Sequence, residues 1–252
     1  MRIESHRGLV TRYPENTLAS FRGAAEAGYD MIELDPRFTS DGHCVILHDP
    51  TPERTGRDAA GNAPDASVRI HDITLAEAQQ YEFGSWYAPE FKGEKLPELK
   101  DVLEFALEKK IPLKFDNVWH HHPDNEQDMF LAEIAASPAK EYCELTCLTV
   151  DAVEKAVTAI EGVRIHYDGM WNSDVREQLR RLISKDRLTV WRRLDNARTS
   201  WCEVPPVTLE EASEIREIAS LGLWLLTEQE ELEAAAAFGA DIIETDGSIL
   251  PV

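Results

Sequence analysis

At 252 residues, the sequence is long enough for one large hydrophobic core, and single-domain α/β barrels commonly have this length. Its 43% hydrophobic and 29% charged residues are typical of a globular protein. The formal net charge of −21 argues against nucleic acid or an anionic membrane surface as a partner. Any bound anion therefore requires locally concentrated positive charge or a metal ion.

The chain begins MRIESHRG, without a basic and apolar leader, and no apolar run approaches the roughly 20 residues of a membrane span. The cysteines show no CxxC spacing, so we expect free thiols in a reducing compartment; they are Cys44, Cys143, Cys147 and Cys202. Together these features predict a cytoplasmic protein without a membrane span.

Short apolar runs alternate with amphipathic helical segments along the whole chain. The runs predict eight strands, at 2–5, 30–35, 112–117, 142–148, 163–167, 188–192, 223–226 and 241–245. Helical spacing of apolar residues occurs between them at 15–28, 96–110, 124–136, 151–160, 173–183, 208–219 and 227–239. Eight strands separated by helices predict a (β/α)8 TIM barrel. A doubly wound open sheet is the alternative, but no GxGxxG-type phosphate loop supports it.

Residues 49–97 interrupt this alternation with prolines, glycines and a polar loop. We interpret them as an insertion between the second strand and its helix, with a short hairpin and a helix of its own. In a barrel, such a βα insertion lies at the face where active sites form. Residues 1–252 are then expected to form a single barrel domain.

The second predicted strand carries two carboxylates on one face, because side chains two residues apart in a strand point the same way. Glu33 and Asp35 share that face, whereas Ile32 and Leu34 share the other. Two neighbouring carboxylates repel each other unless a proton, a cation or a set of donors lies between them. The pair is either a solvated edge or a site for a hard divalent cation, which prefers oxygen ligands.

Further polar residues follow the carboxyl ends of other predicted strands, which converge at one rim of a barrel. His6 and Arg7 follow the first strand, His48 follows the second after the Asp41-Gly42 turn, and Asp116 ends the third. Each has an ordinary interpretation alone, such as packing, capping or an ion pair between Arg7 and Glu15. Their convergence at one rim favours a functional site.

Several motifs resemble those of the glycerophosphodiester phosphodiesterases. In the first 105 residues they are HRG, PENTL, IELDPRFTSDGHCVILHD, PERTG and FGSWYAPEFKGEKLPELKDVL, and near the end GADIIETDGSIL is looser. The resemblance implies that His6 and His48 are the acid–base pair and that Arg7 contacts phosphate. It also implies that Glu33 and Asp35 bind a divalent cation, Mg²⁺ or Ca²⁺.

The third strand departs from the family pattern of a glutamate followed two residues later by a lysine. Here the stretch is LKFDNV, so Asp116 is one methylene shorter and Val118 cannot supply the cation. We expect Asp116 to be the third metal ligand, directly or through water, and Lys114 to replace the lost positive charge. Substrate contacts are therefore predicted for Arg7 and Lys114.

Aromatic and basic residues near strand ends are further candidates. Flat rings suit a sugar or a choline cation, so Trp119 and Trp171 are predicted substrate contacts, whereas Trp224 is assigned to the core. Arg192 and Arg193 are alternative anion contacts, and Glu244 and Asp246 are interpreted as structural. The run His120–His122 is interpreted as a polar loop, because adjacent residues cannot all face one ion.

We therefore predict a metal-dependent phosphoric diester hydrolase that converts a small glycerophosphodiester to a phosphomonoester and an alcohol, a reaction of lipid metabolism. The alternatives are a sugar phosphodiesterase of the agrocinopine type and a relative of the sphingomyelinases D that stops at a cyclic phosphate. A catalytically silent phosphodiester-binding barrel is the alternative from outside the enzymes. The expected partner is a small-molecule substrate, with no nucleic acid, and the oligomeric state stays open.

Overall fold

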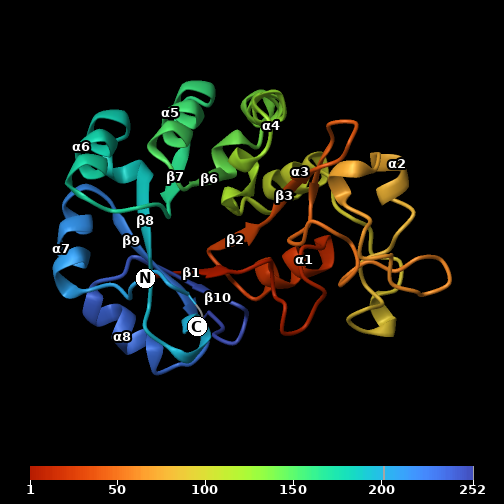
Figure 1. Cartoon of the computed structure of the whole chain (residues 1–252). Coiled ribbons are helices and arrows are strands. Elements are labelled where there is room, and N and C mark those ends of the chain that lie inside the picture. The colour runs from red at the N-terminus through yellow and green to blue at the C-terminus, as the bar shows by residue number, and fades with distance from the viewer. Residues whose placement is uncertain (201, 252) are drawn as a thin grey trace.

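The predicted barrel is confirmed by a computed structural model, which describes residues 1–200 and 202–251. Eight parallel strands close in the order β1-β10-β9-β8-β7-β6-β5-β2. Their bounds are β1 Arg2–Ser5, β2 Met31–Leu34, β5 Leu113–Phe115, β6 Cys143–Cys147, β7 Arg164–Tyr167, β8 Leu188–Arg193, β9 Ser220–Leu226 and β10 Ile242–Thr245. Figure 1 shows the helices packed around the outside of this barrel.

Each predicted helical segment forms a helix outside the barrel. The helices are α1 Leu18–Glu26, α3 Leu99–Lys109, α4 Asp124–Ala136, α5 Val150–Ala159, α6 Ser173–Leu182, α7 Leu209–Ile218 and α8 Glu231–Phe238. Four of them begin after a side chain that accepts a hydrogen bond from a first-turn backbone N–H, namely Thr17, Thr149, Asn172 and Thr208. Gly28 follows α1 with a φ of 86°, in the left-handed region where glycine is favoured.

The chain between β2 and α3 leaves the barrel earlier than the sequence predicts. A two-stranded hairpin, β3 Pro36–Phe38 and β4 Cys44–Ile46, precedes residue 49. The predicted hairpin therefore lies upstream of the 49–97 segment, while the predicted helix within it is confirmed as α2 Leu75–Ala78. Figure 1 shows α2 and its neighbouring loops to one side of the barrel. Pro36 ends the barrel strand because it lacks the N–H that a continued ladder requires.

The segment that carries α2 has a small core of its own. Its buried apolar side chains are Val45, Leu47, Ile70, Ala78, Phe83 and Leu96. Three short 3₁₀ turns lie in or near this region, η1 Ile70–Asp72, η2 Pro89–Phe91 and, after β5, η3 Asn117–His121. Burial of these side chains fixes the insertion against the barrel without a second domain-sized core.

The strands separate apolar and polar side chains between the two surfaces of the barrel wall. Outward-facing residues such as Ile32, Leu34 and Phe115 join the main core beneath the helices. Facing inward, Met31, Trp191 and Ile242 form a small apolar cluster. Most other inward positions are charged or polar and buried, and they are described below. No helix among the described residues is long and apolar enough to cross a membrane.

The remaining 3₁₀ turns connect barrel elements: η4 Lys140–Tyr142, η5 Lys185–Arg187 and η6 Ala197–Thr199. All four cysteines are free, as the sequence predicts. Three of them are buried in the core, where burial raises the pKa of the Cys143 thiol to about 12 and shifts Cys44 and Cys147 upward as well. These thiols therefore stay protonated at neutral pH and serve as packing groups.

Candidate functional site

A cavity of about 670 Å³ opens at the carboxyl ends of the barrel strands. Most of the residues predicted from sequence line it, namely His6, Arg7, Glu33, Asp35, His48, Lys114 and Asp116. They come from β1, β2 and β5 and from the loops that follow these strands. The parallel ladder brings them together because neighbouring strands end at the same rim.

Glu33, Asp35 and Asp116 form an all-oxygen cluster at the base of this cavity. One carboxylate oxygen from each lies within 4.8 Å of the other two. Burial and the neighbouring Asp35 raise the pKa of Glu33, and the same causes raise the pKa of Asp116 to about 6. The three carboxylates thus oppose one another's ionisation, and a hard cation between them relieves that opposition.

Each carboxylate of the cluster has one oxygen that is available to coordinate a cation. Glu33 Oε2 accepts the backbone N–H of Arg7 at 3.0 Å, and Asp116 Oδ1 accepts from Asn117 Nδ2 at 3.1 Å. Asn16 Nδ2 donates to Asp35 Oδ2 at 2.6 Å. Within residues 1–200 and 202–251, the second oxygen of each carboxylate has no protein donor. Donors therefore hold one oxygen of each group and leave one available for coordination.

The local backbone around Arg7 explains why the loop has this sequence. Arg7 and Asn16 have φ values of 57° and 54°, in the left-handed region that is uncommon for residues with a side chain. Gly8 follows with a φ of 86°, and a Cβ there would collide with Ser20. This turn aims the Arg7 N–H at Glu33 and its guanidinium at two carboxylates, with Nε 3.3 Å from Asp35 Oδ2 and an Nη 3.3 Å from Glu15.

His6 lies in the cavity with its proton affinity reduced. Burial lowers its pKa to about 4, although Glu244 and Asp35 act in the opposite direction. Desolvation of the buried imidazole thus outweighs the attraction of these two carboxylates for its charged form. A neutral imidazole at pH 7 is able to accept a proton.

His48 belongs to a chain of polar groups at the edge of the cavity. Its Nδ1 lies 2.7 Å from Asp49 Oδ1, and Arg54 donates to both Asp49 and Glu15. Burial opposes ionisation of Asp49, but hydrogen bonds from Arg54 and His48 lower its pKa. An ionised carboxylate only accepts, so the His48 proton lies on Nδ1 and Nε2 is left for another partner.

Lys114 is buried inside the barrel and lines the cavity. Its Nζ is 2.5 Å from Glu4 Oε1, 2.8 Å from Glu244 Oε2 and 4.0 Å from the centre of the Trp191 ring. These carboxylates raise the pKa of Lys114 despite its burial, and Lys114 in turn lowers the pKa of Glu244 to about 2, also against burial. Glu244 is thus a structural partner, as predicted, while Lys114 lines the cavity with its charge already paired.

The two tryptophans predicted to contact the substrate lie outside the cavity. Trp119 is fully buried in the core, where its indole donates to Thr146 O at 2.9 Å, so the structure does not bring it to the cavity. Trp171 packs against the same core beneath the Arg192 guanidinium, and it is not among the cavity-lining residues. Both tryptophans lie near the ends of barrel strands, as predicted. The direction in which each side chain points could not be predicted from the sequence.

Arg192 and Arg193, the predicted alternative anion contacts, also form hydrogen bonds within the protein. Arg192 donates to Glu211 and to the Trp191 carbonyl, at 2.7 and 2.6 Å. Arg193 donates to the carbonyls of Thr199 and Val204. Both guanidiniums are buried, and neither lines the cavity. They fix the loop after β8 instead of contacting an anion.

Several cavity residues were missed or misassigned from the sequence, among them Asp168, Trp224 and Arg198. Asp168 follows β7 directly, in step with inward-facing His166, and this alternation could have revealed it. Burial raises its pKa to about 7. Trp224, assigned to the core, lines the cavity with Nε1 3.4 Å from Asp168 Oδ1. Arg198, on η6, also lines it and pairs with Asp246, and no sequence signal marked this residue.

The fold and site together define a parallel (β/α)8 barrel with a carboxylate cluster and two histidines at its carboxyl-end rim. The profile of the glycerophosphoryl diester phosphodiesterase family matches residues 6–136, about half of the chain. The chain belongs to this family, as its motifs predicted.

Curated relatives share the matched half. A glycerophosphodiester phosphodiesterase from Caldanaerobacter subterraneus is 38% identical over 107 residues, which are 42% of this chain and 41% of that protein. Human glycerophosphodiester phosphodiesterase 1 is 34% identical over 124 residues, 48% of this chain and 35% of that protein. The alignments thus span less than half the length of these relatives. By their names, both relatives are phosphoric diester hydrolases.

Solved structures resemble the whole chain. A phosphodiesterase from Oleispira antarctica, solved with the product sn-glycerol-3-phosphate, has a TM-score of 0.75 and 21% identity, and the match covers 98% of this chain and 94% of that one. A glycerophosphodiester phosphodiesterase from Thermotoga maritima has a TM-score of 0.66 over the same shares, also at 21% identity. This likeness shows that the fold extends beyond the profile match.

Proposed function

We propose that this protein is a divalent-cation-dependent phosphodiesterase that hydrolyses a small glycerophosphodiester to a phosphomonoester and an alcohol. The observation that carries the proposal is the meeting, in one cavity, of three carboxylates, two histidines and an arginine. The family membership supports it, and so do the names of the curated relatives. Such a set suits a phosphate ester, which needs neutralisation of charge and two proton transfers.

Glu33, Asp35 and Asp116 are the residues that would hold the cation. An all-oxygen donor set favours Mg²⁺ or Ca²⁺ over ions that prefer nitrogen or sulfur. The bound ion would supply positive charge to the phosphate oxygens, which the acidic surface of the protein otherwise repels. Asn16 and the Arg7 backbone keep the carboxylates in place by holding their other oxygens.

His6 and His48 are proposed as the proton-transfer pair, with different roles. His6 is the base, because burial keeps its imidazole neutral and able to accept the proton of the attacking hydroxyl. His48 is the acid, because Asp49 Oδ1 occupies its Nδ1 and orients the ring, so that a proton carried on Nε2 is the one available to the leaving oxygen. A vicinal hydroxyl of the substrate attacks first, and water then opens the cyclic phosphate.

Substrate binding is proposed to involve groups at three depths of the cavity. The Arg7 guanidinium contacts the phosphate from its position beside Asp35. Lys114 contributes to the field from below, since its charge is shared with Glu4 and Glu244. Trp224 takes the role of flat aromatic wall that was expected of Trp119 and Trp171, because it lines the cavity and they do not.

The test is an assay of phosphodiester turnover against a panel of substrates. Purified protein is incubated with glycerophosphocholine, glycerophosphoethanolamine and a sugar phosphodiester, first with a chelator and then with Mg²⁺ or Ca²⁺ restored. We expect turnover that disappears with the chelator and returns with the ion, and that is lost in Asp35→Asn. Preference for the sugar ester would favour the agrocinopine-type alternative, and a cyclic phosphate as end product would favour the lyase.

Absence of turnover with every substrate and every ion would refute the proposed phosphodiesterase activity. If calorimetry then detected binding of intact phosphodiester, the silent binding barrel would replace it.

A further inference from the structure

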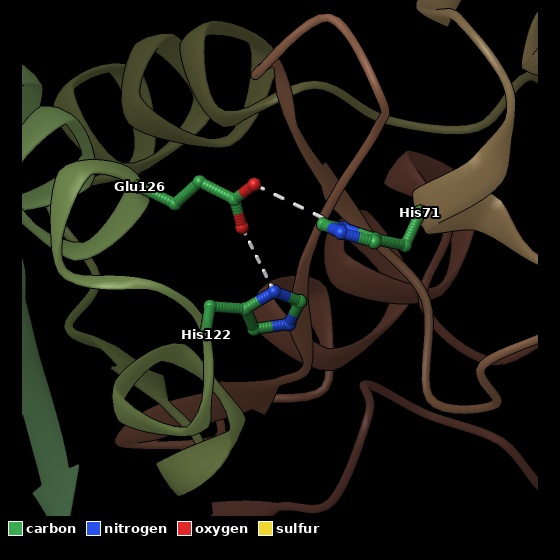
Figure 2. Close-up of side chains that lie close together, drawn as sticks. All are labelled: His71, His122 and Glu126. Atoms are coloured by element: carbon green, nitrogen blue, oxygen red, sulfur yellow. Dashed lines mark hydrogen bonds and ion pairs between the residues drawn. The ribbon is translucent and has the colours of Figure 1, made fainter.

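Three side chains outside the cavity converge from two separate segments. His71 lies on η1 in the insertion, His122 follows η3, and Glu126 is in the first turn of α4. One nitrogen of each imidazole and one carboxylate oxygen lie within 4.8 Å of one another. Figure 2 shows the Glu126 carboxylate pointing between the two imidazoles. We propose that these residues form a second metal site, which binds a transition-metal ion of the Zn²⁺ type.

The distances in the cluster fit coordination to one ion. Two ligand atoms at tetrahedral positions around Zn²⁺, each about 2.1 Å from it, are about 3.4 Å apart. His122 Nδ1 lies 3.0 Å from Glu126 Oε2, and His71 Nδ1 lies 3.9 Å from Glu126 Oε1. These separations lie on either side of the tetrahedral value and run to the two different oxygens of Glu126. One ligand atom of each residue lies within 4.8 Å of the other two, so rotations of the side chains would bring three ligands onto one ion.

The backbone that carries His122 is fixed independently of any ion. Gln127 Nε2 donates to the carbonyls of His120 and His122 at 3.2 and 2.6 Å. The Phe38 ring packs against the His122 imidazole, with centroids 4.7 Å apart. The sequence interpretation that adjacent histidines cannot share an ion fits this arrangement, because His122 alone of the His120–His122 run belongs to the cluster.

His71 is held by its neighbours in the insertion. Ile70 is buried in the small core, and its N–H donates to Pro50 O at 2.9 Å. Only the His71 side chain extends outward, about half exposed. Preorganised ligands on two anchored segments are what a metal site requires, since the ion then binds without ordering the chain.

The surrounding charge determines the kind of ion. Arg37 and Arg69 line the same hollow, of about 220 Å³, and oppose any cation held by charge alone. Mg²⁺ and Ca²⁺ depend on oxygen ligands and negative charge, and this cluster offers one carboxylate. Zn²⁺ forms strong bonds to neutral imidazole nitrogen, and two histidines with one glutamate are a known zinc donor set. The site therefore favours an ion of intermediate hardness, such as Zn²⁺, over Mg²⁺ and Ca²⁺.

The ion would connect the insertion to the loop after β5. His71 is in the insertion, whereas His122 and Glu126 follow β5 and Asp116 along the chain. Three protein ligands leave a fourth position for water or another ligand. Two of the proposed ligands, His71 and His122, line the hollow together with Arg37, whose Nε donates to the His48 carbonyl at 2.8 Å. A metal here would thus join the insertion to the segment after β5.

The experiment is titration of the metal-free full chain with Zn²⁺ by calorimetry, in excess Mg²⁺ to occupy the oxygen cluster. We expect one tight zinc site in the wild type, weakened at least about tenfold in His71→Ala and in Glu126→Gln. His43→Ala removes an exposed histidine outside the cluster and should bind zinc as the wild type does. His71→Ala should keep its fold because this side chain is half exposed.

Two outcomes would overturn the proposal. If Asp116→Asn abolishes the zinc site and His71→Ala does not, the ion binds at the oxygen cluster. If inorganic phosphate raises Tm through Arg37 and Arg69 while Zn²⁺ produces no binding heat, the hollow is an anion site. A visible absorption spectrum of nitrogen-coordinated Co²⁺, present in the wild type and in Asp116→Asn and absent in His71→Ala, would support the site directly. These measurements do not depend on turnover, so they test the second metal site separately from the proposed activity.

Discussion

The buried charges of the barrel form two groups, one deeper and one at the rim. In the deeper group, the Lys114 ammonium lies between the carboxylates of Glu4 and Glu244. At the rim, Glu33, Asp35 and Asp116 converge with no lysine among them, and the nearest guanidinium, Arg7, touches only Asp35 of the three. In the deeper group Lys114 lowers the pKa of Glu244 although burial raises that of Glu4, whereas burial and neighbouring charge raise the pKa values of both Glu33 and Asp116 at the rim.

The difference separates a structural charge cluster from a binding one. Where the chain provides its own cation, ionisation and folding favour each other. Where it does not, the folded protein holds charges that repel, and a ligand from outside is needed to stabilise them. Neutralising Glu244 in the deeper group and neutralising Glu33 at the rim should therefore have opposite effects on stability.

The largest expected effect concerns the histidines above the rim group. His6→Ala and His48→Ala should each lower kcat about 10²- to 10⁴-fold, because each removes one proton-transfer group. The double variant should lose less than the product of the two losses, since both act on one transition state. Steady-state assay of a glycerophosphodiester measures this, with His43→Ala as the matched control.

A nitrophenyl ester sharpens the assignment of the two roles. Its acidic leaving group needs no proton, so it should restore turnover in His48→Ala and not in His6→Ala. Restoration in His6→Ala alone would reverse the proposed roles, and near-wild-type kcat in both variants would exclude the mechanism. Circular dichroism distinguishes loss of chemistry from loss of fold.

Removal of the deeper cation should have the next largest effect. Lys114→Met leaves Glu4 and Glu244 buried without a counter-charge, which typically costs about 3–5 kcal/mol of unfolding free energy. Urea unfolding measures the loss. Adding Glu4→Gln and Glu244→Gln removes the repelling charges and should restore most of the stability. A single variant as stable as the wild type would contradict the role given to Lys114.

The rim group should show the opposite sign. Without divalent ions, Glu33→Gln should raise the unfolding free energy at neutral pH, because it removes a carboxylate whose pKa burial and Asp35 raise in the folded state. The amide oxygen is still able to accept the Arg7 N–H. Saturating Mg²⁺ should raise Tm in the wild type and have little effect in this variant. If metal-free Glu33→Gln were less stable than the wild type, the proposed difference between the rim group and the deeper group would be wrong.

A pH-dependent effect is expected at Asp168, whose carboxyl has a pKa raised to about 7 by burial, against an ordinary value of 3.8. Between these values the folded state keeps a proton that the unfolded state releases, so this group lowers stability as pH rises from about 4 to 7. Asp168→Asn removes that decline, and its advantage over the wild type should grow with pH and level off above pH 7. Urea unfolding at pH 5 and pH 8 checks this, and an advantage that shrinks with pH would contradict it.

The sequence predicted the barrel because its evidence is local and repeated. Each strand is a short apolar run, and each helix has apolar residues three and four apart, so the alternation survives errors at single boundaries. The rim residues followed from the same rule, since strand ends meet in a barrel wherever they occur in the chain. The hairpin at 36–46 was misplaced because its strands are three residues long and directly follow β2.

Side-chain direction beyond the strand ends was less predictable. Trp119 and Trp224 both lie near strand ends, yet the turn of η3 directs Trp119 into the outer core while Trp224 faces the cavity. A sequence gives the position of a residue along an element but not the path of the loop that follows. For the same reason, the meeting of His71 with His122 depends on how the insertion folds, which no periodic pattern encodes.

Closure of the barrel has a consequence for how the chain is made. β1 pairs with β10 on one side, from Arg2 opposite Ile242 to Ser5 opposite Thr245, and with β2 on the other. During synthesis, the first strand therefore exposes one edge until the last strand has left the ribosome. Such an open edge is able to pair with other chains. Closing so long a loop is also slow, because its entropy is lost before the final ladder forms. The edge of β1 is therefore protected from such pairing only once β10 completes the wall.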